Sequence, residues 1–220
     1  MGESVVVAGR RTQVERRQTA EERILEAALE LIAEVGASKI TLEDVGKRAG
    51  YSRGLPAHYF GNKEGLIVNL INEVIPRFRR LHFRGPRPTQ GLARVISGVD
   101  AYVRGAGDDA PEYKAFQILM TDAIAPTKND ALRASLLASN EHALRSLEFH
   151  IRAGVEKGEI DADVNVRGAA IVILGAMRGT VEQFFLDPEK YAIEIWREQF
   201  LSVIERALES PARAREAKRA

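Results

Sequence analysis

Within eleven residues the chain carries an arginine, a histidine, a tyrosine and a lysine, at Arg53, His58, Tyr59 and Lys63. An arginine guanidinium can form two parallel hydrogen bonds with a phosphate or with the edge of a guanine base. A lysine ammonium attracts phosphate as a compact charge, and tyrosine and histidine add further hydrogen-bonding groups. The chemistry of this cluster is recognition by charge and hydrogen bonding.

Signatures of catalysis are missing from the sequence. It has no phosphate-binding loop, no G-x-S-x-G, no H-E-x-x-H and no repeated E-x-x-H. His142 and His150 are about two turns apart on one predicted helix, too far apart to chelate one metal ion by themselves. His58 and His82 are expected at the surface. We therefore predict no enzyme activity, no metal site and no cofactor.

Residues 41–65 are predicted to position the polar cluster on two short helices joined by a tight turn. Thr41 with Asp44 forms a capping box that begins the first helix, and Gly50 supplies the left-handed residue that ends it. Ser52 is a second N-cap, so the link is only three residues long, which suits a helix-turn-helix. Gly46, inside the first helix, predicts close approach of the second helix.

The second helix of such a motif presents its N-terminal residues to base edges when the motif binds DNA. Pro56 is the fourth residue after the Ser52 cap, where it removes a helix hydrogen bond, so we expect a distorted start to this helix. Asn62 caps the next helix, and Lys63 in its first turn is predicted to reach a phosphate. The candidate DNA-contacting residues are Thr41, Ser52, Arg53, Leu55, His58, Tyr59 and Lys63.

A further helix supports the motif, and a basic arm precedes that helix. Thr19 with Glu22 predicts a capping box, followed by an apolar stripe that ends at Gly36. Ahead of it lie four arginines opposed by one glutamate: Arg10, Arg11, Arg16, Arg17 and Glu15. Such a run is often only a solvated face, but beside a helix-turn-helix we favour contact with phosphates or with the minor groove.

Composition and hydropathy favour a cytoplasmic protein. The 220 residues include 45% hydrophobic residues, no cysteine and a net charge of +1. The apolar content is enough for a sizeable core, and the lack of cysteine excludes disulfides and thiolate chemistry. The first nine residues do not resemble a secretory signal, and the longest apolar run, residues 169–177, is about half of a membrane span. We predict no membrane partner.

Helical periodicity continues to the end of the chain, and no stretch alternates as strands do. Pro76 predicts a kink in the helix that leaves the motif, which is either a lever or a passive bend. Loops are predicted at residues 84–91 and 105–111, and a turn at residues 158–163. Long helices are predicted over residues 129–157 and 166–186, and an amphipathic helix from Ile193 ends the fold. The prediction is an all-α fold with about nine helices.

The last two helices carry features of self-association. Gly175 and Gly179 have the spacing that lets helix backbones approach closely. Trp196 and Phe200 add large apolar surfaces on the final helix. An ordinary monomer core is the alternative explanation of these features.

Four motifs carry a family resemblance: Thr41-x-x-Asp44-Val45, Ala49-Gly50-x-Ser52-x-Gly54, Tyr59-Phe60 and Lys63-Glu64-x-Leu66. Over residues 20–70 they resemble the TetR family of bacterial transcriptional regulators. The sequence departs from the family at Pro56 and Ala57, where an aliphatic residue and a phosphate-binding tyrosine are usual, so that tyrosine contact is not transferred to this chain.

The resemblance implies how the chain is divided. We expect a disordered basic arm over residues 1–18 and a DNA-binding domain of three helices over residues 19–65. A helical effector-binding and dimerisation domain is expected over residues 66–209, and a basic disordered tail over residues 210–220. In the family the last two helices form the dimer interface.

The resemblance also implies a small-molecule pocket among the middle helices. Aromatic and methionine residues at helical spacing are more often core than ligand wall. Tyr102 and Tyr113 are the better candidates because a buried hydroxyl needs a partner, although backbone groups are an equal alternative. The candidate ligand-binding residues are Phe78, Tyr102, Tyr113, Phe116, Met120, Phe149 and Met177.

The predicted function is a homodimeric transcriptional repressor that a small-molecule effector releases from its operator. A two-fold dimer presents two recognition helices roughly 34 to 36 Å apart, so the operator is expected to be a near-palindrome. One alternative is a DNA-binding regulator that has no effector. Another is a helical ligand-binding protein whose N-terminal head docks on a protein, which salt-insensitive failure to bind duplex DNA would favour.

Overall fold

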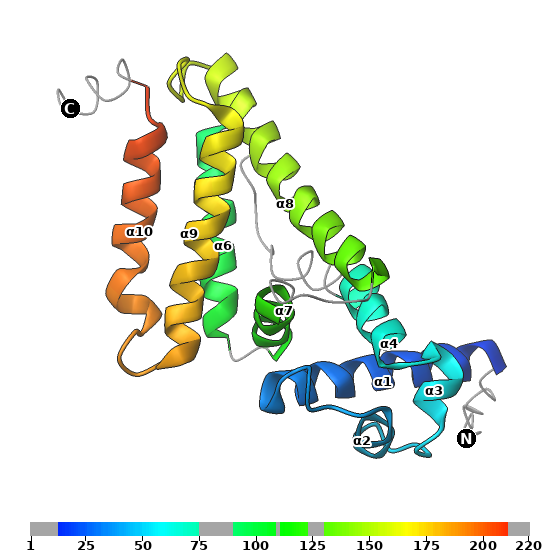
Figure 1. Ribbon diagram of the computed structural model, residues 1–220. Helices are drawn as coiled ribbons and strands as arrows, with labels where there is room; N and C mark the ends of the chain where they lie inside the picture. The colour runs from blue at the N-terminus through cyan, green and yellow to red at the C-terminus, as the bar shows by residue number, and fades with distance from the viewer. Residues whose placement is uncertain (1–12, 75–89, 109–110, 123–129, 211–220) are drawn as a thin grey trace, which may run out of the picture.

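The computed structural model describes residues 13–74, 90–108, 111–122 and 130–210, which are mostly helical (Figure 1). The helices are α1 Gln13–Val35, α2 Leu42–Arg48, α3 Leu55–Phe60, α4 Lys63–Asn69, α6 Leu92–Gly107, α7 Pro111–Asp122, α8 Asp130–Glu156, α9 Val166–Leu186 and α10 Ile193–Leu208. A π-helical turn, Leu70–Val74, continues α4. These residues contain no strand, only an isolated bridge between Ile160 and Glu209. The predicted all-α fold is confirmed.

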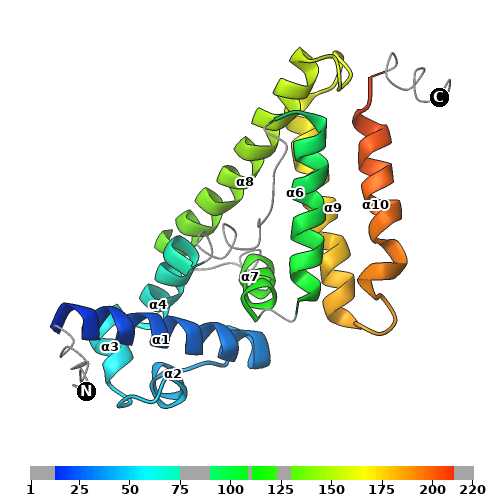
Figure 2. The same ribbon diagram turned by 180° about the vertical axis from the view of Figure 1, so that it is seen from behind.

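The helices are arranged with the motif at one end and the last two helices at the other. Figures 1 and 2 show α1 to α4 gathered together, with α2 and α3 on the outer side of α1. α9 and α10 run beside α6 at the opposite end, and α8 runs obliquely from α9 to α4. α7 lies crosswise between α1 and this bundle. The helix-turn-helix therefore projects away from α9 and α10.

One hydrophobic core joins the motif to the rest of the molecule. Ile24 of α1, Val45 of α2 and Leu66 of α4 are fully buried in it. The apolar stripe predicted for the first helix is therefore confirmed. Phe116 and Leu119 of α7 belong to the same core, so α7 packs directly on the helices that carry the motif.

α1 begins earlier than its capping pattern predicts. The helix starts at Gln13, and the Thr19 hydroxyl donates to the carbonyl oxygen of Glu15 at 2.8 Å. The predicted capping box of Thr19 with Glu22 is therefore wrong, because a threonine inside a helix can bond the carbonyl four residues earlier. Residues 13–18 of the predicted arm are helical, and residues 1–12 and 211–220 lie outside the described residues.

A second core fills the space between α6, α8, α9 and α10. Its buried members include Val99, Ile151, Ile173 and Ile204. The turn between α8 and α9 holds the start of α6, because the Glu159 carboxylate accepts the amide of Leu92 at 2.9 Å where Gly91 offers no side-chain cap. This carboxylate also complements the positive end of the α6 dipole.

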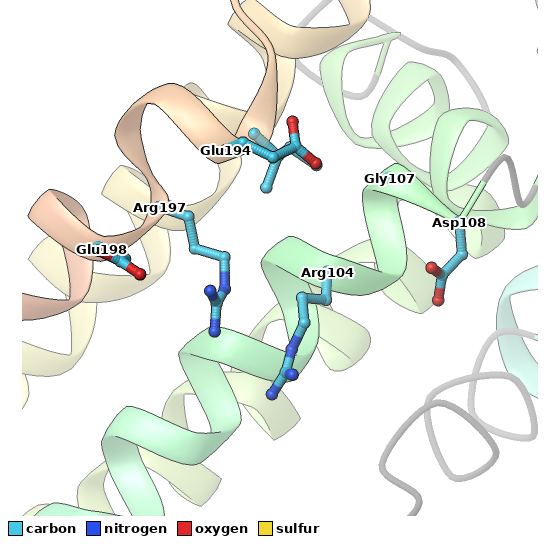
Figure 3. Close-up of a pocket in the computed structure, with 7 residues that line it drawn as sticks. Arg104, Gly107, Asp108, Glu194, Arg197 and Glu198 are labelled. Atoms are coloured by element: carbon cyan, nitrogen blue, oxygen red, sulfur yellow. The ribbon is translucent and has the colours of Figure 1, made fainter.

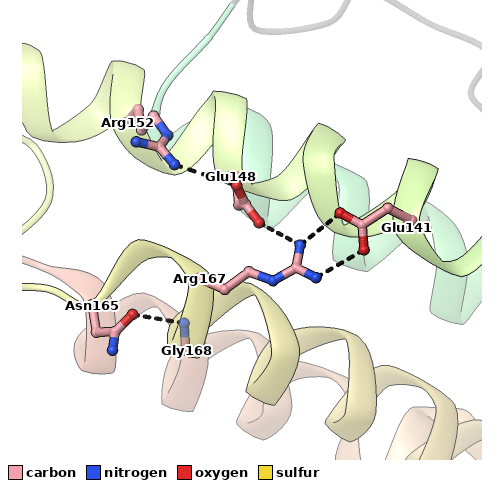
Figure 4. A network of polar contacts seen from close by, with 6 residues as sticks. All are labelled: Glu141, Glu148, Arg152, Asn165, Arg167 and Gly168. Carbon is pink, nitrogen blue, oxygen red and sulfur yellow. Dashed lines mark hydrogen bonds and ion pairs between the residues drawn. The ribbon is translucent and has the colours of Figure 1, made fainter.

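Arg167 ties α9 to α8 on the outside of this core (Figure 4). Its guanidinium pairs with Glu141 at 2.8 Å and with Glu148 at 2.6 Å, and Arg152 also pairs with Glu148. The hydrogen bonds from Arg167 lower the pKa of both carboxyl groups. Because Arg167, Glu141 and Arg152 are exposed to solvent, these pairs orient the helices more than they stabilise them.

The later helices follow the predicted pattern with one correction. The predicted long helices correspond to α8 and α9, and the last one begins at Ile193 as expected. α6 continues to Gly107, so the loop predicted over residues 105–111 starts too early. The predicted kink at Pro76 and residues 84–89 of the other loop lie outside the described residues.

α9 is more apolar than its nine-residue run suggests. Taken as a whole it is long and apolar enough to cross a membrane, with a mean hydropathy of 1.4 over 18 residues. Core helices of water-soluble proteins pass the same test, so this is weak evidence for a span. α9 packs against α6, α7 and α8, although only 28% of its apolar window is buried within the described residues of the protomer.

Candidate nucleic-acid interface and helical interior

The first helix of the motif begins as predicted. The Thr41 hydroxyl oxygen accepts the amide of Asp44 at 3.2 Å and donates to the Asp44 carboxylate at 2.6 Å. Gly50, with a φ of 76°, provides the left-handed residue after the helix. Both predictions are confirmed, and together they fix the two ends of α2.

The turn is longer than predicted and the second helix begins later. Ser52 does not cap it: the carbonyl oxygen of Ser52 accepts the amide of Leu55 at 3.1 Å, and α3 starts at Leu55 after Gly54. Pro56 therefore lies in the first turn of α3, where its missing N–H would have no intrahelical partner. The predictions of a Ser52 cap and of a distorted helix start are wrong for this reason.

Gly46 allows the second half of the motif to lie close to α2. A Cβ at this position would be 2.8 Å from the carbonyl oxygen of Ser52 and 3.3 Å from both Arg53 Cα and Pro56 Cδ. The predicted close approach is confirmed, with the turn and the buried proline as the contacting parts. Packing of Pro56 on Gly46 thus sets which face of α3 is left free.

The free face of α3 and of the preceding turn carries polar side chains and one alanine. Arg53, Ala57 and His58 are exposed, and 69% of the Arg53 side chain is accessible despite an ion pair with Glu43 at 3.6 Å. Leu55 is half-buried against the core of the motif. Ala57, which is not among the predicted contacts, lies on this face beside His58.

Three predicted DNA-contacting residues make contacts within the protein. Thr41 caps α2, and the half-buried Tyr59 has the Arg17 guanidinium 5.6 Å from its ring centre. The Lys63 ammonium donates to the carbonyl oxygens of Ser38 at 2.9 Å and of Ile40 at 3.2 Å. Lys63 therefore joins the start of α4 to the segment before α2, and its phosphate contact stays a prediction.

Arg48 braces the motif against α1. Its guanidinium pairs with Glu34 at 2.7 Å and with Glu30 at 3.2 Å. The hydrogen bond from Arg48 lowers the pKa of Glu34, and the two carboxylates raise the pKa of Arg48. This planar pairing holds α2 at a fixed angle to the supporting helix.

Part of the predicted ligand-binding set meets in the interior of the body. The rings of Tyr102 on α6 and Tyr113 on α7 are 5.4 Å apart in an edge-on arrangement. Tyr113 and Phe116 are buried, and Met177 is buried on α9. Met120 is half-buried against the core of the motif.

Two members of the predicted ligand-binding set do not join this interior. Phe149 is 56% exposed, and its ring lies edge-on to the ring of His150. The helical spacing of Phe149 placed it on α8 but not on the inner face, so its assignment to the pocket is corrected. Phe78 lies outside the described residues.

Sequence reasoning missed three polar side chains of this interior. Gln117 of α7 is buried, and its amide donates to the carbonyl oxygen of Arg178 at 3.2 Å. Arg178 of α9 donates to the side chain of Asn140 on α8 at 2.7 Å. The available signal was an arginine in the middle of an otherwise apolar helix.

A shallow depression of about 360 Å³ lies between α6 and α10, away from these residues (Figure 3). Its lining is Arg104, Gly107, Asp108, Ile193, Glu194, Arg197 and Glu198. Beside it Asp100, a buried carboxylate of α6, pairs with Arg104 and with Arg197. The depression therefore accompanies an ion-pair junction between two helices and includes no predicted ligand-binding residue.

The predicted dimer residues fall into two groups. A Cβ at Gly175 or Gly179 would meet no atom of the protomer, so both glycines lie on an open face of α9. Trp196 and Phe200 instead pack against the protomer's own cores, and the Trp196 indole donates to the carbonyl oxygen of Tyr191. For these two residues the contacts agree with the monomer-core explanation.

Metal ligands are not grouped in the part of the chain that the structure describes. No three histidine or acidic side chains there lie close enough together to hold a metal ion. His142 and His150 share α8, and burial lowers the pKa of His150.

Comparisons with known proteins agree with the geometry of the motif. The family model of the bacterial regulatory proteins, tetR family, matches residues 24–70. The fatty acid metabolism regulator protein of Bacillus subtilis is 28% identical over 173 residues, which cover 77% of this chain and 85% of that protein.

Solved structures share the fold over most of the chain. A TetR-family transcriptional regulator from Rhodococcus sp. has a TM-score of 0.72 at 21% identity, over 87% of this chain and 100% of that one. FadR from Bacillus subtilis in complex with stearoyl-CoA has a TM-score of 0.68 at 22% identity, over 83% and 96%. The capped helix-turn-helix, whose second helix is free on its outer face, lies within the residues that match the tetR family model, and the chain is a DNA-binding transcriptional regulator similar to the members of that family.

Proposed function

We propose that this regulator is a homodimeric repressor that binds a near-palindromic operator through α3 and leaves it when a small molecule binds in the helical body. The observation that carries the proposal is the free face of α3. Arg53, Ala57 and His58 are exposed there, while Pro56 packs on Gly46 behind them. Arg53 is then available to a guanine edge or a phosphate once it leaves Glu43.

The apolar face of α9 and α10 supports the homodimer. Val172 of α9 is 69% exposed and Ile195 of α10 is 70% exposed, and the open faces of Gly175 and Gly179 lie on the same α9 helix. A monomer would leave this apolar surface in water, whereas a second copy would bury it. We propose a two-fold interface here, which presents two α3 helices to successive turns of the operator.

α7 supports a route from the body to the DNA-binding end. Its Phe116 and Leu119 pack in the core shared with α1, and its Tyr113 and Gln117 take part in the interior of the body. A ligand that displaces α7 would therefore also move α1. The complex of the B. subtilis relative with stearoyl-CoA supports a small molecule in a body of this fold.

Selection of bound sequences from random DNA tests the DNA-binding part. The expected result is a near-palindrome bound by two chains, with affinity that falls as salt rises. In the same assay Arg53→Ala should lower discrimination between the selected site and random DNA by about 1 to 3 kcal/mol. An asymmetric site bound by one chain would contradict the dimer, and no selected sequence at any salt would contradict the function.

An effector-independent regulator is the second candidate, and the tight packing of the interior favours it. Tyr102 lies edge-on against Tyr113, and Phe116 is buried beside Arg178. If operator affinity does not change with any molecule that binds the body, the effector-independent function is correct. We place either regulator in the cytoplasm, where the operator is found.

A further inference from the structure

Among the described residues, the half-buried Arg178 of α9 has no charged partner. Arg178 projects from α9 between α7 and α8, donates to the Asn140 amide oxygen at 2.7 Å, and lies 6.0 Å from the centre of the Phe116 ring. Its Nε atom is buried and has no hydrogen-bond partner among the described residues. Burial lowers the pKa of this arginine, because desolvation disfavours its charged form.

Two other arginines of the body, on α9 and α10, form ion pairs with carboxylates. Arg167, eleven residues earlier on the same helix, pairs with Glu141 and Glu148. Arg197 of α10 pairs with the buried carboxylate of Asp100. Within the described residues Arg178 has no ion pair. The Asn140 amide and the Phe116 ring contact its guanidinium, and Tyr102 is an electrostatic neighbour. An unpaired charge in such a place destabilises the folded protein unless a partner arrives.

The unused edge of the guanidinium has the shape of an anion site. Nη1 is engaged by Asn140, whereas no described residue bonds Nε or Nη2. These two atoms present parallel N–H groups, which match the two oxygens of a carboxylate or phosphate. The Phe116 ring, whose centre is 6.0 Å from the guanidinium carbon, is buried and apolar.

We propose that Arg178 binds the anionic group of the effector, and that the effector is an amphipathic anion whose apolar part packs among α6, α7 and α9. This proposal rests on the proposed function, because only a regulator released by a small molecule has an effector. The anion is a carboxylate or a phosphate, since both fit the same edge. Ligand binding then neutralises the half-buried charge of Arg178 near α7, which contacts the core of the motif.

The test is a calorimetric titration of the full-length chain with dodecanoate, dodecyl phosphate and dodecanol. The three probes share one apolar chain and differ in the head group. We expect either anion to bind about 10- to 100-fold more tightly than the alcohol, because charged hydrogen bonds are stronger than neutral ones. Preference for the phosphate or for the carboxylate identifies the natural head group.

Two variants separate anion binding from a structural role. Arg178→Met should remove the preference for anions, leave dodecanol binding unchanged, and not lower the melting temperature without ligand, because it deletes an unpaired charge. Arg167→Met is the matched control on the same helix and should keep the preference. Equal binding of alcohol and anions by the wild type, no binding by any probe, or a preference that survives in Arg178→Met would overturn the proposal.

Measuring operator binding as well shows whether the anion site or the proposed function fails. Arg178→Met should no longer release the selected operator when the preferred anion is added, whereas Arg167→Met should release it as the wild type does. If the wild type binds no operator, the proposed function fails while the titration still decides the anion site. If the operator is bound and the anion preference is absent, only the present inference fails.

Discussion

Gly46→Ala tests whether close packing of the motif positions α3. The new Cβ would lie 2.8 Å from the carbonyl oxygen of Ser52, a distance that side-chain carbons do not adopt, and 3.3 Å from Pro56 Cδ. Both neighbours belong to rigid parts of the motif, a backbone carbonyl and a proline ring. The turn and α3 must therefore move away from α2.

Two opposing energies set the size of the effect. Alanine gains about 1 kcal/mol over glycine in the interior of α2. Forcing an extra carbon into a close contact costs about 1 to 3 kcal/mol. We therefore expect the free energy of unfolding to fall by at most about 2 kcal/mol, so that the variant still folds. Loss of one aligned base contact through the shift of α3 would lower operator affinity roughly 5- to 150-fold.

Fluorescence anisotropy with the selected operator and urea unfolding measure the two quantities. Lys47→Ala is the control, because this neighbour on α2 is exposed and pairs only loosely with Asp44 at 3.9 Å. The control should keep its stability and lose at most a small, salt-dependent part of its affinity. If the free energy of unfolding of Gly46→Ala rises by about 1 kcal/mol and the variant binds the operator like the wild type, close packing at Gly46 does not position α3.

Three further changes test other parts of the molecule. Thr41→Ala removes the acceptor of the Asp44 amide and should lower the free energy of unfolding by about 1 kcal/mol, measured in urea; an unchanged midpoint would show that the cap contributes nothing. Gly175→Ala adds a Cβ that meets nothing in the protomer, so it should stabilise the protomer by about 1 kcal/mol. The same Cβ should weaken the dimer, which sedimentation measures. An unchanged dimer would exclude close approach of the partner helix at this glycine. Burial lowers the pKa of His150 below its ordinary 6.5, so folding stability should be full above that value and fall as the pH drops below it. His150→Gln should reduce this loss between about pH 7.5 and pH 5.5, and identical pH slopes for both proteins would contradict it.

Local sequence signals predicted the ends of several elements because the interactions involved are local. Thr41 and Asn62 cap the helices that follow them, each through an oxygen that accepts an amide three residues on. Gly50 ends α2 in the left-handed conformation. These contacts need no knowledge of the tertiary fold. Gly46 was also informative, because a glycine inside a helix has few explanations other than a close neighbour.

The failed predictions involve competition between several local possibilities. Ser52 and Thr19 both have the side chain of a cap, but the Ser52 carbonyl closes a turn and the Thr19 hydroxyl bonds within a longer helix. Phe149 has helical spacing, yet the position of α8 relative to its neighbours decides which face is inward. Such choices depend on tertiary packing, which spacing along the chain does not encode.

The polar group around Arg178 explains why the proposed ligand site was harder to predict than the proposed DNA-contacting surface. Tyr102, Gln117, Asn140 and Arg178 come from four different helices, α6, α7, α8 and α9. No window of sequence contains them together, whereas the motif lies within twenty-five residues. Hydrogen bonds join these groups across the helices, and the guanidinium among them keeps one edge unused.

The position of α7 makes this polar group relevant to DNA binding. α7 faces the polar group with Gln117 and faces the core of α1 with Phe116 and Leu119, and the Arg178 guanidinium lies over Phe116 itself. Closely packed interiors transmit displacements, because they have no free volume to absorb them. An anion that draws Arg178 away from Phe116 therefore changes packing under α1, the helix to which Arg48 fixes α2. Loss of effector response in Arg48→Ala, with anion affinity unchanged, would support this route.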